Sequence, residues 1–157
     1  MKTLFLLRHG KSEWPEGIED EERPLSRKGT DDLILLSEYL KQRKIKFDHV
    51  HVSSALRTRE TFLVLKKKKV KVKDILFTAM LYEKSGEEML QYVKEKDNNT
   101  DCVMLIGHNP GLEELAQMLT GNANFSKFPT SAFLQIEFDT DQWAECQNGK
   151  IRLFWIP

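Results

Sequence analysis

Apolar and polar positions along the chain form two kinds of pattern. Short runs rich in apolar residues are typical of sheet strands, and we expect strands near 3–8, 48–53, 102–107, 131–138 and 150–156. Apolar positions three and four residues apart predict helices near 26–43, 54–66, 85–96 and 110–120. Strands that alternate with helices predict an α/β fold, here a three-layer α/β/α sandwich. We expect a mostly parallel central sheet, with an antiparallel edge formed by the last two strands.

Two of the predicted strands end at a histidine. The first apolar run stops at Arg8-His9, where the chain must turn. The run near 102–107 is followed by His108-Asn109-Pro110, and we expect Asn109 to cap the next helix and Pro110 to begin it. Ligands of open α/β sheets bind beyond the carboxyl ends of the strands. Both histidines are therefore expected at one ligand site.

A third strand end contributes an arginine. Ser54 is expected to cap the helix that follows the second strand, which places Arg57 in the first helical turn. Free backbone N–H groups and the positive end of the helix dipole favour an anion at that position. Taken alone, Arg57 is typical of an ordinary helix surface. Together with Arg8, His9 and His108, it predicts a cluster that can bind three phosphate oxygens.

These motifs resemble those of the histidine phosphatase superfamily, which includes cofactor-dependent phosphoglycerate mutases and many phosphatases. The similarity is greater to the short SixA-like branch, the phosphohistidine phosphatases, and it extends in order over nearly the whole chain. The segments that carry it are Arg8-His9-Gly10, Arg23-Pro-Leu-Ser26-x-x-Gly29, Ser53-Ser-x-x-Arg57-x-x-x-Thr61, Gly107-His108-Asn109-Pro110 and Phe128-Pro-Thr-Ser131-Ala. Two positions depart from the family pattern: Pro15 stands where mutases usually carry Asn, and Ser54 replaces a usual Pro.

The resemblance implies a role for each residue of the cluster. His9 would be the phosphorylated nucleophile, and Arg8, Arg57 and His108 would form the phosphate pocket. Phosphate or substrate binding is further assigned to Gly10, Ser12, Arg23 and Asn109.

The general acid is open between two carboxylates. The resemblance to the SixA-like branch suggests Asp20, whereas Glu83 is the nearest match, by order along the chain, to a glutamate that larger superfamily members use. Each of them is also typical of a solvated loop.

Composition narrows the function further. The chain has 157 residues, a size typical of one domain, and we expect a single histidine phosphatase domain over 1–157. The formal net charge is zero, which gives no electrostatic argument for nucleic acid or an anionic membrane as partner. Apolar runs are too short for a membrane span or a signal peptide. Cys102 and Cys146 are expected to be free thiols, so we expect a cytoplasmic protein.

Two further features have competing interpretations. The run Lys66–Lys73 holds six lysines, which we interpret as a solvated helix end; docking of an acidic partner protein is the alternative. His49 and His51 share a face of a predicted strand and could chelate a metal, but too few further ligands are evident. We therefore expect no metal and no other cofactor.

The expected function is that of a metal-independent phosphatase that forms a phosphohistidine on His9. Phosphoryl transfer requires mainly positioning and charge neutralisation, which arginine and histidine side chains can supply. The chain ends directly after its last predicted strand, so we expect an open pocket that suits protein phosphohistidine as substrate. The alternatives are a small-molecule phosphomonoesterase of the same superfamily and a non-catalytic module that recognises phosphorylated partners.

Overall fold

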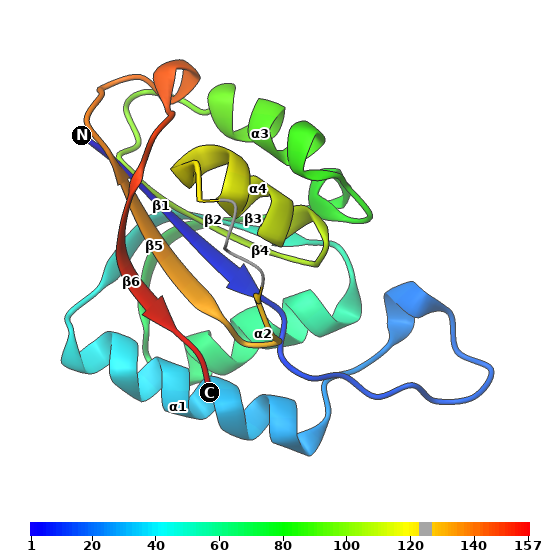
Figure 1. Ribbon diagram of the computed structural model, residues 1–157. Coiled ribbons are helices and arrows are strands. Elements are labelled where there is room, and N and C mark those ends of the chain that lie inside the picture. The colour runs from blue at the N-terminus through cyan, green and yellow to red at the C-terminus, as the bar shows by residue number, and fades with distance from the viewer. Residues whose placement is uncertain (123–126) are drawn as a thin grey trace.

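The computed structural model describes residues 1–122 and 127–157, which form a six-stranded sheet covered by helices on both faces (Figure 1). The strands are β1 (Lys2–Arg8), β2 (Lys46–Ser53), β3 (Lys71–Thr78), β4 (Cys102–Gly107), β5 (Phe133–Phe138) and β6 (Lys150–Trp155). Their order across the sheet is β3-β2-β4-β1-β5-β6. The first four in this order are parallel, and β5 is antiparallel to both β1 and β6. This confirms the expected mostly parallel sheet with an antiparallel edge.

Four α-helices lie on the two faces of the sheet in the described residues: α1 (Arg27–Gln42), α2 (Leu56–Lys67), α3 (Gly86–Lys94) and α4 (Gly111–Thr120). Figure 1 shows α1 and α2 on one face and α3 and α4 on the other. Three short 3-10 helices lie in the loops of the described chain: η1 (Asp20–Glu22), η2 (Ala79–Leu81) and η3 (Trp143–Glu145). The three-layer α/β/α sandwich is thereby confirmed.

The sheet separates two apolar cores. Side chains alternate along a strand, so Leu4 and Leu6 of β1 belong to the core under α3 and α4. Phe5 and Leu7 belong to the other core, under α1 and α2. Because β1 is buried on both faces, the residues that follow it are held in place by packing on both sides of the sheet.

Three local predictions were wrong. The run Lys66–Lys73 is not one helix end, because α2 stops at Lys67 and β3 begins at Lys71. The sequence hides this strand because alternating lysines replace apolar residues in its first half. Ser54 is not the cap of α2, which is Ala55, and Asn109 is not the cap of α4, which is Pro110.

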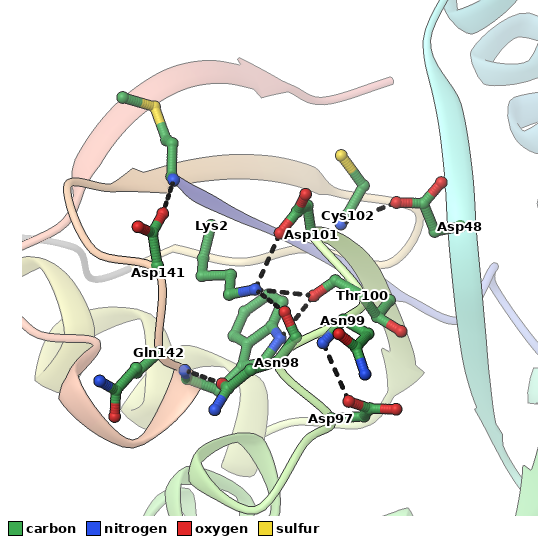
Figure 2. Close-up of polar contacts among 12 residues, drawn as sticks. Lys2, Asp48, Asp97, Asn98, Asn99, Thr100, Asp101, Cys102, Asp141 and Gln142 are labelled. Atoms are coloured by element: carbon green, nitrogen blue, oxygen red, sulfur yellow. Dashed lines mark hydrogen bonds and ion pairs between the residues drawn. The ribbon is translucent and has the colours of Figure 1, made fainter.

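The amino end of β1 is fixed by a buried lysine (Figure 2). Lys2 is only 1% exposed, and its Nζ donates to the backbone carbonyls of Asn98 and Thr100 and to a carboxylate oxygen of Asp101, at 2.6, 3.2 and 2.8 Å. An ammonium group has three donors, so this one is fully satisfied by the protein. The indole of Trp143, fully buried, donates to the Thr100 carbonyl at 2.7 Å and joins η3 to the same loop.

No helix in the described part of the chain is long and apolar enough to cross a membrane.

Candidate active site

The carboxyl ends of β1 and β4 bring the two predicted histidines together. The strands are parallel with Arg8 opposite Gly107, and the His9 backbone N–H donates to the Gly107 carbonyl at 3.1 Å. The ring centroids of His9 and His108 are 5.2 Å apart. The sequence-based prediction that these strand ends meet is thus confirmed in the geometry.

His9 is held in one orientation and one tautomer. It is buried, and its Nδ1 lies 2.7 Å from the Gly10 carbonyl oxygen. A carbonyl only accepts, so Nδ1 carries the proton and Nε2 keeps its lone pair. Burial lowers the pKa of His9 to about 3; the Gly10 hydrogen bond opposes this shift, and the nearby Arg57 and Arg8 charges add to it. The imidazole is therefore neutral at pH 7 and presents an unprotonated Nε2.

Gly10 helps to orient the His9 imidazole and does not itself offer an N–H group to an anion. Its backbone N–H donates to Thr61 Oγ1 at 3.0 Å and is not free for a phosphate oxygen, in contrast to the expectation from sequence. A Cβ at this position would lie 2.8 Å from Leu33 Cδ1 and 3.1 Å from the Gly29 carbonyl oxygen. Glycine is required because the turn packs directly against α1.

His108 is held from the neighbouring strand. Its Nε2 lies 2.7 Å from Ser53 Oγ, at the carboxyl end of β2. Its buried Nδ1 has no hydrogen-bond partner in residues 1–122 and 127–157. Burial lowers the pKa of His108 to about 3, and Arg57 lowers it further. A buried polar atom without a partner is costly, so it marks a place where a ligand oxygen can bind.

The two predicted arginines are also incompletely satisfied. Arg57 is 6% exposed, and the Nε atoms of both Arg8 and Arg57 are buried without a partner in the described residues. One Arg8 nitrogen donates to the Phe128 carbonyl at 3.1 Å. Burial lowers the pKa of Arg8 from its usual value, although an arginine remains charged at any ordinary pH. Two desolvated guanidinium groups beside two neutral imidazoles form a pocket for an anion.

Asp20 occupies part of that pocket. Arg57 donates to the Asp20 backbone carbonyl at 2.7 Å and to its Oδ2 at 3.1 Å. The Tyr82 hydroxyl donates to the same Oδ2 at 2.6 Å, and Arg23 donates to Oδ1 at 3.1 Å. The Tyr82 hydrogen bond, with Arg23 and Arg57, lowers the pKa of Asp20 to about 2. The ionised carboxylate thus stands where a phosphoryl oxygen would meet Arg57.

The remaining predicted residues build the rim. Arg23 donates to Ser12 Oγ at 2.6 Å and to the Glu13 carbonyl at 3.0 Å, and its guanidinium stacks on the exposed Trp14 ring. Ser12 therefore contacts Arg23 rather than the histidines. Asn109 donates to the Phe128 carbonyl at 2.8 Å, the acceptor that Arg8 also uses.

The other carboxylate candidate lies apart from this network. Glu83 is exposed, in a left-handed conformation with φ of 53°, and among the described residues no hydrogen bond joins it to the pocket. Its neighbour Tyr82 holds Asp20 instead. Of the two acids that the sequence left open, the structure brings only Asp20 to the arginines.

Four further residues support the pocket, and the sequence analysis assigned no role to them. Ser53 orients His108, Thr61 fixes Gly10, and Tyr82 holds Asp20. The Ser131 backbone N–H donates to the carbonyls of Arg8 and His9, and its buried hydroxyl is unpartnered in the described chain. Ser53, Thr61 and Ser131 lie inside the sequence motifs shared with the histidine phosphatases, and these motifs could have indicated their importance. Tyr82 lies outside every such motif.

The described residues contain no group of three or more His, Cys, Asp or Glu side chains that could hold a metal ion. His49 and His51 do share a face of β2, where their ring nitrogens contact one another and His51 Nδ1 bonds the Tyr92 hydroxyl at 2.6 Å. This pair lies outside the strand-end pocket.

Comparison with known proteins identifies the family. The model of the histidine phosphatase superfamily (branch 1) matches residues 4–89, more than half of the chain. The chain belongs to this superfamily, and membership supports phosphatase activity. The matched residues include Arg8, His9 and Arg57.

Three individual proteins are similar over most of the chain. An uncharacterized chloroplastic protein of Arabidopsis thaliana is 31% identical over 147 residues, which are 85% of this chain and 66% of that protein. A crystal structure of a protein from Agrobacterium tumefaciens, provisionally assigned as the phosphohistidine phosphatase SixA, matches with a TM-score of 0.87. The two sequences are 25% identical, and the match covers 99% of this chain and 98% of the Agrobacterium chain. The protein histidine phosphatase SixA complexed with tungstate has a TM-score of 0.84 at 22% identity, over 97% and 95% of the two chains, and this likeness shows the fold.

Proposed function

We propose that this phosphatase removes phosphoryl groups from phosphohistidine side chains of proteins through a covalent intermediate on His9. The observation that carries the proposal is the state of His9. Its Nδ1 proton is held by the Gly10 carbonyl and its pKa is about 3, so Nε2 is an unprotonated nucleophile at pH 7. The similarity to SixA proteins supports the substrate class.

The reaction proceeds in two displacements. Nε2 of His9 attacks phosphorus, and the P–N bond to the substrate imidazole breaks as the new N–P bond forms. Arg8 and Arg57 neutralise the phosphoryl oxygens, and the departing imidazole takes up a proton. Water then attacks phosphorus and gives its proton to the Asp20 carboxylate, the bond between His9 Nε2 and phosphorus breaks, phosphate leaves, and His9 returns to its neutral form. The proton stays on Nδ1, hydrogen-bonded to the Gly10 carbonyl, throughout.

Asp20 is proposed as the proton donor to the leaving group. With a pKa of about 2 it is ionised in the free protein. A bound phosphoryl dianion competes for Arg57 and adds negative charge, which raises the pKa of this carboxyl toward that of a usable acid. Imidazole leaves with less help than an alkoxide does, so Asp20→Asn is expected to slow phosphohistidine hydrolysis less than about tenfold, and phosphomonoester hydrolysis about 10²-fold or more. Equal losses on both substrates would contradict this role.

The central test is a parallel assay on two substrate classes. We expect faster turnover, as kcat/KM, of a phosphohistidine-bearing protein than of sugar and nucleotide phosphates. Faster turnover of the small esters would instead establish a small-molecule phosphomonoesterase. Tight binding without turnover would establish a phosphate-recognition module.

His9→Ala tests the intermediate itself. The variant is expected to lose activity about 10⁴-fold or more and to take up no label from ³²P-phosphorylated substrate after rapid acid-free quenching. His49→Ala is the matched control, because that imidazole lies outside the pocket. A labelled, active His9 variant would show that another group is the nucleophile.

Metal independence is part of the proposal, because Arg8, Arg57 and His108 supply the charge that other phosphatases obtain from metal ions. Activity is expected to persist in excess EDTA. Loss of activity that a divalent metal restores would overturn the metal-free scheme.

We further propose that residues 1–157 act as one histidine phosphatase domain in the cytoplasm. Two observations support this: both cores are built on one sheet, and both Cys102 and Cys146 are free thiols, as a reducing compartment favours.

A further inference from the structure

Positive charge is concentrated where α1 leads into β2 and where α2 leads into β3. The segments 41–46 and 66–73 hold ten of the 24 Lys and Arg residues of the chain and none of its 24 Asp and Glu residues. The rest of the chain therefore carries an excess of ten negative charges, although the whole chain is neutral. The helix dipole favours cations in the last turn of a helix, which accounts for Lys41, Lys66 and Lys67. It does not account for the lysines that continue into the two strands.

The two segments repeat one local structure. Both helices end in a Schellman motif, in which the residue after the cap donates three residues back and the next donates five residues back, at 3.0 and 3.1 Å in each case. The residue after the cap is Lys44 in one motif and Lys69 in the other, with left-handed φ values of 56° and 66°. Glycine is favoured there, because a side chain strains left-handed backbone. Two lysines thus stand where glycine would stabilise the fold.

The sheet brings the two repeats together. The strands β2 and β3 are parallel neighbours, and Lys46 lies opposite Lys71. A cavity of about 430 Å³, here called the lysine cavity, is lined from both segments. Its lining residues are Lys41, Lys44, Ile45, Lys46, Lys69 and Lys71. A second cavity, of about 540 Å³, shares the last three of these lysines, so the basic surface is continuous.

The protein leaves most of this charge without a counter-ion. Of the ten basic residues, Lys41 alone has an ion pair with another described residue, with Glu38 at 3.1 Å. Asp48 borders the second cavity, but its Oδ2 also accepts from the Cys102 N–H at 3.2 Å. Like charges on directly opposite residues of two strands are destabilising. A cleft lined by charges of one sign concentrates ions of the other sign, so the lysine cavity is suited to an anion of high charge.

We propose that the lysine cavity binds a compact polyphosphate, either an inorganic chain or the triphosphate group of a nucleotide. Its volume is that of a small-molecule site, and ammonium groups are phosphate ligands. The site lies at the amino ends of β2 and β3, whereas His9 follows the carboxyl end of β1, so it is separate from the strand-end pocket. None of the exposed large hydrophobics in the described chain lies in the two basic segments, so they present no side chain of this kind for insertion into a bilayer.

The test is calorimetric titration in EDTA with inorganic tripolyphosphate, on chains that also carry Arg57→Ala to weaken binding in the strand-end pocket. We expect one tripolyphosphate per chain at about 0.15 M salt, bound at least about tenfold more tightly than orthophosphate. ATP is expected to compete for the same site. Tighter binding of ATP would identify a nucleotide as the ligand, and tighter binding of tripolyphosphate an inorganic chain. Absence of binding, or tighter binding of a polyglutamate peptide or of phosphatidylserine vesicles, would overturn the proposal.

Matched double variants separate a ligand site from a structural role. Lys44→Gly with Lys69→Gly is expected to weaken tripolyphosphate binding about tenfold or more, since two ammonium groups are lost. The same pair should raise the melting temperature by about 2–6 °C, because glycine relieves the left-handed strain. Lys28→Gln with Lys150→Gln removes two exposed charges outside the cavity and should change the affinity less than about twofold. Unchanged binding by the glycine pair, an equal loss in the control pair, or a lower melting temperature of the glycine pair would each contradict the proposal.

Discussion

Two cations stand at the two ends of β1, the buried Lys2 and the half-buried Arg8, and they differ in which groups accept their hydrogen bonds. Lys2, at the amino end, has three protein acceptors for its three donors (Figure 2). Arg8, at the carboxyl end, has one acceptor, the Phe128 carbonyl, and a buried Nε without a partner in the described chain. The same strand therefore carries a cation that stabilises the fold and a cation that is available to a ligand.

The residues around Lys2 and around Arg8 differ in the same way. Around Lys2, the loop 98–101 supplies backbone carbonyls and a carboxylate, so the charge is neutralised locally. Around Arg8, the neighbours Arg57, His9 and His108 are cationic or neutral, and although Asp20 binds Arg57, three of the four side chains keep an unpartnered nitrogen in the described chain. Such a concentration of unsatisfied donors is destabilising unless an anion binds. Substitutions at the two ends should thus affect different properties of the protein.

The largest effect is expected from Arg57→Ala at the carboxyl end. Loss of a guanidinium that neutralises a transferring phosphoryl group is expected to lower kcat/KM about 10³-fold. The melting temperature should stay equal or rise, because a buried group with an unpartnered Nε is removed. Steady-state kinetics and thermal unfolding of one preparation measure both. A variant that unfolds at a much lower temperature would mean that Arg57 is mainly structural.

The pH dependence of stability should also originate in large part at the carboxyl end, where His9 and His108 lie; His51 of β2, whose pKa burial also lowers to about 3, contributes from outside the pocket. His9 and His108 have a pKa of about 3 in the folded state, against about 6.5 when unfolded. The unfolded chain therefore binds more protons between these values, so stability is complete above pH 6.5 and falls as the pH drops toward 3. Denaturant unfolding at several pH values measures this slope, and His9→Gln with His108→Gln should reduce it and leave the contribution of His51. An unchanged slope in the double variant would place the acid sensitivity elsewhere.

Lys2→Met should act on stability instead of catalysis. The methionine retains the stem that packs near Trp143 but removes the donor to the Asn98 carbonyl and the Asp101 carboxylate, and leaves the Thr100 carbonyl with the Trp143 indole as donor. We expect a loss of about 1–3 kcal/mol in the free energy of unfolding, by the cost of unsatisfied buried groups. Turnover at a temperature where the variant is folded should stay within about twofold of the parent chain, since the substitution leaves the distant pocket intact. A loss of kcat without a loss of stability would remove the distinction between the two ends.

The contrast also explains which residues could be predicted from sequence. Arg8, His9 and His108 follow apolar runs directly, and strand ends of a parallel sheet converge by geometry, so their meeting was predictable. Lys2 looks like any exposed lysine at a chain start, because its acceptors come from a loop nearly a hundred residues away. When a side chain is buried because its acceptors come from a distant segment, the sequence around that residue shows no pattern that would predict its burial.

The same reasoning accounts for β3 and for Asp20. The lysines of β3 alternate with apolar residues, and without knowledge of a neighbouring strand they are typical of a helix end as well. Asp20 was one of two candidate acids, and what distinguishes it is Tyr82, brought across from residue 82 by η2. Sequence order pointed to Glu83, one position away from the side chain that makes the contact.

The smallest expected effect tests how His108 is oriented. Ser53→Ala removes the hydroxyl that lies 2.7 Å from His108 Nε2 and leaves the backbone of β2 unchanged. One hydrogen bond contributes about 1 kcal/mol, so kcat should fall about five- to tenfold while KM stays nearly constant. Ser53→Thr, which keeps the hydroxyl, should recover most of the lost rate if the added methyl group is accommodated. Thr58→Ser, a neighbouring buried hydroxyl that bonds only backbone carbonyls, is the control and should leave kcat unchanged. A rise in KM without a change in kcat would mean that Ser53 supports substrate binding and does not position His108 for the chemical step.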